Sequence, residues 1–156
     1  MAIRNKEKPE TALQNKYWKF WEGFNAYTHN KPAFCSEFKV HPFPSVRSYQ
    51  DYSIGKPYHL VVGVNFKKHE IRVGVYFRDL DAYLFYSEML KNCIERSIGR
   101  SLKWVRHETK ASAYLYDSAD FDANHGFENA FEVMANRMLQ IKSVFNFVPP
   151  KLSNDI

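Results

Sequence analysis

The chain has 156 residues, 45% of them hydrophobic and 17% aromatic, which predicts one domain with a core large enough to fold without disulfides or metal ions. Its 22 Lys and Arg residues outnumber its 17 Asp and Glu residues, and the formal net charge of +5 is a mild excess that is compatible with a polyanionic partner. Because no apolar run approaches the ~20 residues that span a bilayer, and the charged start lacks the apolar segment of a secretory signal, we expect a soluble, cytoplasmic protein with no membrane partner.

The first predicted element is an aromatic helix. Residues 1–10 are polar and are expected to form a flexible leader. After them, Tyr, Phe and Trp residues recur at the spacing of one helical face, and Thr11 is suited to cap the first turn. We therefore predict a helix over residues 12–27.

The segment of residues 30–57 contains four prolines and cannot form one regular element. A structureless loop of this length is unusual in a compact domain. We therefore predict a short strand over residues 37–41, with Phe38 and Val40 on its buried face.

The clearest local pattern is an alternation of apolar and polar residues in two neighbouring runs. The apolar positions are Leu60, Val62, Val64 and Phe66 in the first run and Ile71, Val73, Val75 and Phe77 in the second. This period of two predicts an antiparallel hairpin with one buried face. The other face is predicted to carry His59, Val61, Gly63, Asn65, Glu70, Arg72, Gly74 and Tyr76. Its two glycines are expected to leave room for a partner to approach.

A capped helix is predicted after this hairpin. Its apolar stripe consists of Tyr83, Leu90, Ile94 and Ile98. This spacing predicts a helix over residues 80–98, with Asp79 or Asp81 as its cap and Gly99 at its end.

A second hairpin and a last helix complete the chain. Residues 102–107 and 111–116 are predicted to pair across a turn at residues 108–110. An uninterrupted apolar stripe then predicts a helix that starts near Asn124 and stops before Pro149-Pro150.

The predicted order is a helix, a short strand, and then strand, strand and helix twice. This order is typical of an α+β domain with an antiparallel sheet of four or five strands and helices packed mainly on one face. We place this single domain at residues 11–148 and a C-terminal tail at residues 149–156.

Several short motifs in one order and spacing resemble a known family. They are Tyr52-Ser53-Ile54-Gly55, Arg72-Val73-Gly74-Val75-Tyr76, Ile94-Glu95, Gly99, Leu102-Lys103-Trp104 and Lys110-Ala111-Ser112. The combination resembles the domain of unknown function 4268 family from about Tyr17 to Phe145. The resemblance implies a prokaryotic accessory domain, often C-terminal to a restriction-type nuclease domain, and therefore a nuclease or restriction-type protein as a partner. It gives no catalytic residues to carry over to this chain.

One position departs from the family's pattern. The family usually carries an acidic residue in the second strand of the hairpin, in a Val-Glu-x-Tyr setting, whereas this chain has Gly74 there. Any role of that carboxylate is therefore lost in this chain.

A metal-dependent nuclease needs carboxylates that hold a metal ion and a lysine that stabilises charge in the transition state. Glu37-Phe38-Lys39 and Glu108-Thr109-Lys110 match the Asp/Glu-x-Lys half of that pattern. No acidic strand residue precedes the first match, and the second falls in a predicted turn. We favour solvated charge pairs, expect no catalytic residues, and keep a nuclease as the second alternative function.

The acidic segment before the last helix partly matches a calcium loop. Asp120, Asp122 and Asn124 alternate as its oxygen ligands would, but Gly126 falls at the seventh position and Phe131 stands where a bidentate carboxylate is needed. Acidic residues that precede a helix also act as caps and dipole partners, which is the interpretation that we favour.

Other metal and cofactor patterns are missing from the sequence. Cys35 and Cys93 fit neither a disulfide framework nor a Cys-x-x-Cys site, so we expect two reduced thiols. The six histidines show no ligand spacing, and no phosphate-binding glycine loop is present. We therefore predict no metal site and no cofactor.

The remaining candidate site is the open face of the predicted sheet. Aromatic rings among basic groups can stack on bases and neutralise phosphates. The predicted nucleic-acid-binding residues are Lys67, Lys68, Arg72, Tyr76, Lys103, Arg106 and Lys110, and the predicted interaction face adds His59, Asn65, Tyr114 and Tyr116. The alternative is that the first helix, the proline-rich segment or a second copy of the protein covers this face.

Basic residues gather between residues 91 and 110, whereas residues 111–136 contain no Lys or Arg, so we expect a molecule polarised in charge. The two hairpin turns would also bring their basic residues together if the hairpins lay side by side. We predict a non-catalytic accessory domain associated with nucleic acid and linked to nuclease or defence systems. The alternative is a protein-interaction or homo-oligomerising module that uses the open face.

Overall fold

The computed structural model describes residues 7–55 and 58–146, so the predicted tail, the stop at Pro149-Pro150 and most of the predicted leader lie outside the described residues. Five strands form one antiparallel sheet in the order β1-β2-β3-β5-β4. The strands are β1 (Tyr49–Ser53), β2 (Tyr58–Asn65), β3 (Glu70–Phe77), β4 (Lys103–Arg106) and β5 (Ala111–Ser118). The helices are α1 (Ala12–His29), α2 (Pro32–Cys35), α3 (Leu80–Phe85), the π-helical turn η1 (Tyr86–Leu90), α4 (Lys91–Ile98) and α5 (Gly126–Val144).

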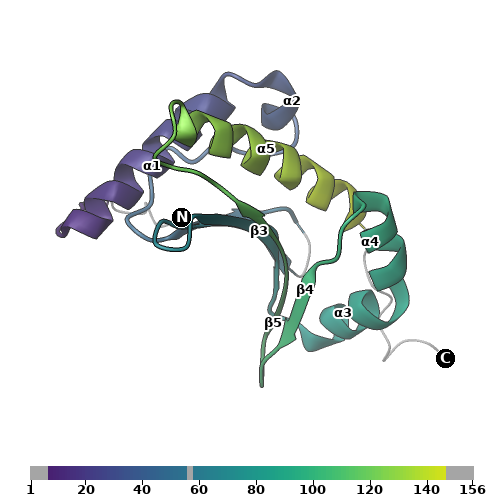
Figure 1. Cartoon of the computed structure of the whole chain (residues 1–156). Coiled ribbons are helices and arrows are strands. Elements are labelled where there is room, and N and C mark those ends of the chain that lie inside the picture. Colours follow the sequence, from purple (N-terminus) through teal and green to yellow (C-terminus); the bar gives the residue numbers. More distant parts are fainter. Residues whose placement is uncertain (1–6, 56–57, 147–156) are drawn as a thin grey trace.

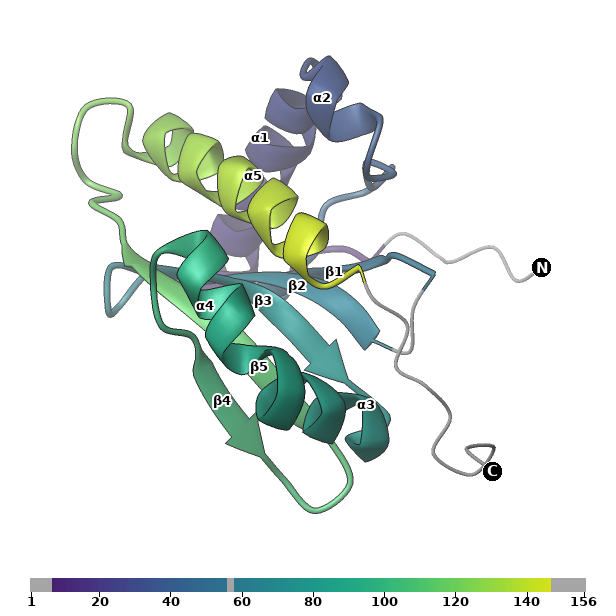
Figure 2. The same cartoon turned by 90° about the vertical axis from the view of Figure 1, so that its right-hand side faces the viewer.

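The described helices lie on one face of the sheet, and the opposite face carries none of them (Figures 1 and 2). The sheet bends, and its bare face lies on the inner side of the bend (Figure 1). This arrangement confirms the predicted α+β class with helices mainly on one side. We call the two sides of the sheet the covered face and the open face.

The covered face is a continuous apolar core. Its buried strand residues are Leu60, Val62, Val64, Ile71, Val73, Val75, Phe77, Ala113 and Leu115. The predicted alternation in β2 and β3 is confirmed, because these side chains meet the aromatic stripe of α1 and the apolar stripe of α5. Phe20 of α1, for example, is fully buried and packs edge to face on Phe66 and Phe131. The core therefore closes without disulfides.

Helix α1 begins where the sequence predicts it and runs one half-turn further, to His29. Thr11 and Gln14 form a capping box, in which the Gln14 backbone N–H donates to the Thr11 hydroxyl at 3.1 Å. These reciprocal bonds satisfy free N–H groups of the first turn. The helix is thereby fixed at its start, with Trp21 and Phe24 turned into the core.

The predicted strand over residues 37–41 is wrong, and the first strand is β1 instead. Phe38 is buried because its ring packs on Phe34 of α2 and on Tyr52, at centroid distances of 4.9 and 5.7 Å, and not because it pairs with a strand. In β1 the buried position 50 is a glutamine, whose amide donates to Asn25 at 2.9 Å. A polar residue at a buried position hides the alternation that would have revealed this strand.

The helix predicted over residues 80–98 is confirmed at both ends but contains the π-helical turn η1. Asp79 caps its start by accepting from the Asp81 N–H at 2.9 Å, and Gly99 ends it with a φ of 80°. A π turn adds one residue to a helical turn and shifts the side chains that follow. The turn begins at Tyr86, whose hydroxyl lies 3.1 Å from that of Tyr58.

Glu95 explains part of the motif spacing that marks the family. Its Oε2 atom accepts from the Leu102 backbone N–H at 2.7 Å and from Trp104 Nε1 at 3.2 Å. These bonds hold the end of α4 against the start of β4, around the turn at Gly99. The Glu95 to Trp104 motif is therefore a structural clamp.

Candidate functional site

Cross-strand pairing arranges the open face in rows. One row consists of Ser53, His59, Tyr76, Ser112 and Val105. The next consists of Asp51, Val61, Gly74, Tyr114 and Lys103. A third consists of Tyr49, Gly63, Arg72 and Tyr116, and a fourth of Asn65, Glu70 and Ser118. All four predicted interaction-face residues lie on this face, together with the predicted binding residues Arg72, Tyr76 and Lys103.

The two glycines of this face do not leave room for a partner, contrary to the expectation from sequence. A Cβ atom at Gly63 would lie 2.5 Å from the guanidinium carbon of Arg72, and one at Gly74 would lie 2.7 Å from the Tyr114 ring. Each glycine is paired directly with the large residue that fills its space. Such cross-strand packing over glycine stabilises a sheet. The space above each glycine is filled by a side chain of the neighbouring strand. A ligand on this face would therefore contact Arg72 and Tyr114 and not the glycines.

Arg72 and three tyrosines form a cluster at the centre of the open face, which we call the tyrosine platform: Arg72, Tyr76, Tyr114 and Tyr116. The guanidinium carbon of Arg72 lies 5.5 Å from the Tyr114 ring centroid, within the range of a cation–π interaction. The rings of Tyr114 and Tyr116 are 6.2 Å apart and meet edge to face. The members are half-buried, so the rings are held in place and yet reach solvent.

The platform is electrostatically mixed. Burial raises the pKa of Tyr114 above its ordinary value, and the neighbouring Tyr116 and Tyr76 raise it further. The charge of Arg72 and its hydrogen bond to Tyr114 lower the pKa and so partly offset this rise. Tyr114 is therefore a neutral phenol at physiological pH. Asp51 and Glu70 also lie on the face, at the β1 side and at the β2–β3 turn, whereas Lys103 lies at the β4 edge.

The basic residues of the two hairpin turns do not come together. Glu70 pairs with Ser118 and Phe77 with Ala111, so the turn with Lys67 and Lys68 lies at one end of the sheet and the turn with Lys110 lies at the other. The hairpins do lie side by side, which was the condition for this patch, but β3 and β5 are antiparallel and their turns point in opposite directions. The two turns cannot form one phosphate-binding patch.

A basic rim does exist along α4 and β4, which are neighbours in the fold (Figure 2). Its exposed members are Lys91, Arg96, Lys103, Arg106 and Lys110. Arg100 is excluded because it forms an ion pair with Asp117, which Arg137 also binds at 3.1 Å. Five of the six basic residues between residues 91 and 110 are thus exposed on this side, and the sixth, Arg100, is used internally.

The two nuclease-like matches differ in their surroundings. Glu37 follows α2 in a turn and forms an ion pair with Lys142 of α5 at 2.8 Å. Glu108 and Lys110 are exposed at the β4–β5 turn, as predicted. The structure brings neither pair next to a second carboxylate on a strand, within the residues that it describes.

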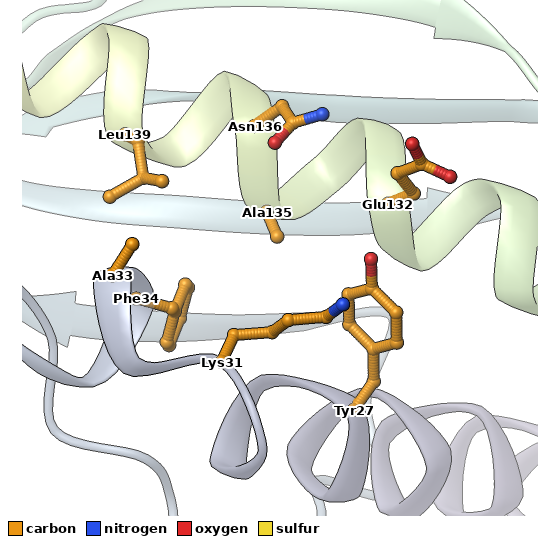
Figure 3. A pocket seen from close by; sticks show the side chains of 8 residues that line it. All are labelled: Tyr27, Lys31, Ala33, Phe34, Glu132, Ala135, Asn136 and Leu139. Atoms are coloured by element: carbon orange, nitrogen blue, oxygen red, sulfur yellow. The ribbon is translucent and has the colours of Figure 1, made fainter.

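A small pocket lies between α5 and the junction of α1 with α2 (Figure 3). Its volume is about 220 Å³, below the roughly 300–1,000 Å³ of typical small-molecule sites. Tyr27 and Lys31 point into it from one side, and Glu132 and Asn136 stand on the other. Lys31 Nζ lies 4.8 Å from the Tyr27 ring centroid and so is already paired with a side chain of the pocket. We do not assign function to this pocket.

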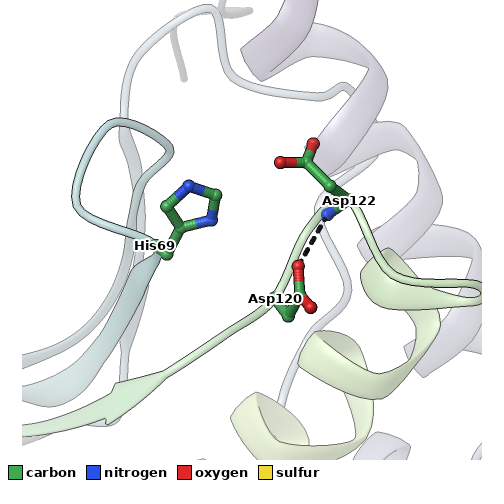
Figure 4. Close-up of side chains that lie close together, drawn as sticks. All are labelled: His69, Asp120 and Asp122. Carbon is green, nitrogen blue, oxygen red and sulfur yellow. Dashed lines mark hydrogen bonds between the residues drawn. The ribbon is translucent and has the colours of Figure 1, made fainter.

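The acidic segment before α5 does not cap the helix, so this part of the prediction is wrong. The helix begins at Gly126, its N-cap is His125, and no side chain caps it. Asp120 instead accepts from the Asp122 N–H at 3.2 Å, and both carboxylates lie beside His69 (Figure 4). Sequence spacing missed this group because His69 is distant in the chain. The pairing of Glu70 with Ser118 brings the segments together, and an accurate strand register would have predicted it.

These features define the class of the protein: an α+β domain with a five-stranded antiparallel sheet, helices on one face and an aromatic open face. The sequence model of the family described as domain of unknown function (DUF4268) matches residues 16–148, and the chain belongs to this family. No curated protein and no solved structure matches it. None of the described helices combines the length and the apolar character that a membrane crossing needs.

Proposed function

We propose that the protein is a non-catalytic accessory domain that binds single-stranded nucleic acid on its open sheet face, in the setting of a nuclease or defence system. The observation that carries this proposal is the tyrosine platform, since it combines rings and a guanidinium on a bare and concave part of the sheet (Figure 1). The prokaryotic setting, which the family resemblance implies, and a cytoplasmic location are both part of the proposal.

Base stacking is the first interaction that the platform offers. Tyr76 and Tyr116 flank the Arg72–Tyr114 pair and reach solvent, and tyrosines on a sheet surface stack on bases without reading their sequence. Because their backbone belongs to the central strands β3 and β5, the rings need little ordering when a ligand binds. A weak sequence preference is the expected consequence.

Phosphate neutralisation is the second interaction. The basic rim of α4 and β4 borders the platform through Lys103, which pairs with Tyr114. A strand of nucleic acid with its bases on the platform would bring its backbone close to Lys103 at the β4 edge. Phosphate contacts of this kind fix position and supply affinity that falls with salt.

Self-association through the same face is the alternative function. The ring of Tyr49 favours it, because it lies on the open face with 37% of its surface exposed. The outer strand β1 does not favour strand-to-strand extension, since His41 Nε2 lies 2.6 Å from the carbonyl oxygen of Asp51 and occupies that edge. Sedimentation across a range of concentrations tests this alternative, and a monomer throughout excludes it.

The test of the proposed function is the anisotropy of a labelled single-stranded oligonucleotide at several salt concentrations. We expect binding that weakens as salt rises, and a loss in Tyr116→Leu of about 1–3 kcal/mol, roughly 5- to 150-fold in affinity. Arg72→Ala should also weaken binding. Lys19→Ala is the control for charge, because Lys19 is exposed on α1, on the other side of the sheet.

Two results would contradict the proposal. One is that the wild-type protein binds no single-stranded DNA or RNA at low salt. The other is that Lys19→Ala weakens binding as much as Arg72→Ala does, which would assign the affinity to net charge and not to the open face.

A further inference from the structure

His69, Asp120 and Asp122 bring three metal-binding side chains together from two segments of the chain (Figure 4). His69 belongs to the β2–β3 turn, and both aspartates belong to the loop between β5 and α5. One donor atom of each residue lies within 4.8 Å of the other two. All three residues are exposed, so an ion has free access.

The backbone holds these two segments in register. The Ala119 N–H donates to the carbonyl oxygen of His69 at 2.8 Å, and the His69 ring stacks on Phe121 with centroids 6.2 Å apart. The loop itself rests on the start of α5, where a Cβ atom at Gly126 would lie 2.8 Å from the Phe121 carbonyl oxygen. The imidazole and the carboxylates are therefore placed together by the fold.

The carboxylates of this cluster are not used by ion pairs. Among the described residues, no lysine or arginine pairs with Asp120 or Asp122, and His69 forms no ion pair with either of them. Two carboxylates without a cation repel each other, and a positive charge between them relieves that repulsion. Lys67 and Lys68, in the same turn as His69, form no ion pair with these carboxylates. The position between the carboxylates is therefore open to another cation.

The donor set selects the kind of cation. An imidazole nitrogen with two carboxylate oxygens suits zinc and similar divalent transition metals, whereas magnesium and calcium prefer oxygen donors alone. Zinc holds such donors at about 2.0–2.2 Å, which places neighbouring donors about 3–4 Å apart. The cluster needs only small side-chain movements to reach this geometry. Three protein donors leave a position for water.

We propose that His69, Asp120 and Asp122 form a binding site for a divalent transition-metal ion such as Zn²⁺, which clamps the β2–β3 turn to the loop before α5. This site lies at the end of the sheet and is separate from the tyrosine platform. The proposal is independent of nucleic-acid binding, because neither the donors nor the loop belongs to the open face.

Isothermal titration of the untagged chain with Zn²⁺ tests the site. All proteins carry Cys35→Ser and Cys93→Ser, because both thiols are exposed and would bind zinc themselves. Asp122→Asn keeps the shape of the side chain. His69→Asn suits the left-handed backbone at position 69, where φ is 51° and asparagine is tolerated. We expect one site in the parent protein, and each variant should weaken it by about tenfold or more.

The matched controls are His107→Asn and Glu108→Gln, at the opposite end of the sheet, and they should bind zinc like the parent protein. In the parent, zinc should shift the backbone amide signals of residues 67–70 and 119–124 together in an NMR titration. The proposal is overturned if the parent binds no zinc, if the cluster variants bind as tightly as the controls, or if the shifted amides lie elsewhere.

Discussion

The two faces of the sheet use aromatic side chains in different ways. On the covered face the rings of α1, α5 and the strands interlock and are sealed from water, as Phe20 and Phe77 illustrate at 0% exposure. On the open face Tyr76 and Tyr116 stay half-exposed, and their neighbours fill the space above glycines. The first face provides stability, and the second provides a rigid surface at little cost in stability. Changes on the two faces should therefore have separable consequences.

The largest effect on stability is expected from Phe20→Ala. Phe20 contacts the rings of Trp21, Phe66, Phe121, Phe127 and Phe131. Removing a fully buried ring from such a cluster leaves a cavity, and we expect a loss of about 3–5 kcal/mol in the free energy of unfolding. Urea unfolding followed by fluorescence measures it. A loss below about 1 kcal/mol would mean that the core relaxes around the site and that the covered face is not closely packed.

The second prediction compares the two glycines of the open face. Gly74→Ala forces a Cβ atom against the β5 backbone, at 2.7 Å from the Tyr114 Cα atom, whereas Gly63→Ala meets only the movable end of Arg72. We expect a loss of about 1–3 kcal/mol for Gly74→Ala and under about 1 kcal/mol for Gly63→Ala. The same unfolding experiment checks both. Equal losses would show that Arg72 is held as firmly as backbone.

Much of the fold follows from the sequence, because strong periodicity reflects burial against a single core. The alternation in β2 and β3, the Thr11 cap and the Gly99 stop each depend on nearby residues, and all three predictions are confirmed. Strand β1 was missed because Gln50 is buried with Asn25 as its partner. Burial of a polar residue depends on a distant hydrogen bond that no local pattern contains.

The open face was predicted in composition but not in geometry. The residues of the tyrosine platform follow from the period of two along each strand. The direction of the turns and the fit of Arg72 on Gly63 depend on the pairing of β3 with β5, and residues 78–110 separate these strands in the sequence. The His69 cluster depends on the same pairing. Register between strands that are distant in sequence is the information that the sequence lacked.

The third prediction concerns alkaline pH and the tyrosines of the covered face. Burial raises the pKa of Tyr52 and of Tyr58 well above the ordinary value near 10. Above pH 10 the unfolded chain releases these protons while the folded chain keeps them. Stability is therefore complete below pH 10 and falls as pH rises, by at most about 1.4 kcal/mol per pH unit for each tyrosine.

Tyr58→Phe tests this pH dependence. Its hydroxyl donates to the Phe145 carbonyl oxygen, so the variant should lose about 1 kcal/mol at neutral pH. It should also lose less additional stability than the wild type between pH 9.5 and 11, as measured by urea unfolding at each pH. Parallel curves for the two proteins would mean that Tyr58 ionises in the folded state as easily as in the unfolded state.

The smallest effect on stability is expected from Arg72→Ala, although this residue lies at the centre of the tyrosine platform. Its contact with the Tyr114 ring is partly exposed, and we expect its removal to cost at most about 0.5–1 kcal/mol. Because the charge and hydrogen bond of Arg72 lower the pKa of Tyr114, the variant should raise that pKa further. Absorbance titration of tyrosinate measures this pKa. Subtracting the titration curve of the double variant Arg72→Ala, Tyr114→Phe from that of Arg72→Ala leaves the signal of Tyr114. A small loss of stability with a raised Tyr114 pKa would show that Arg72 contacts this ring at the surface and contributes little to the stability of the fold. A loss as large as that of Phe20→Ala would show that the open face stabilises the domain in the same way as the covered face.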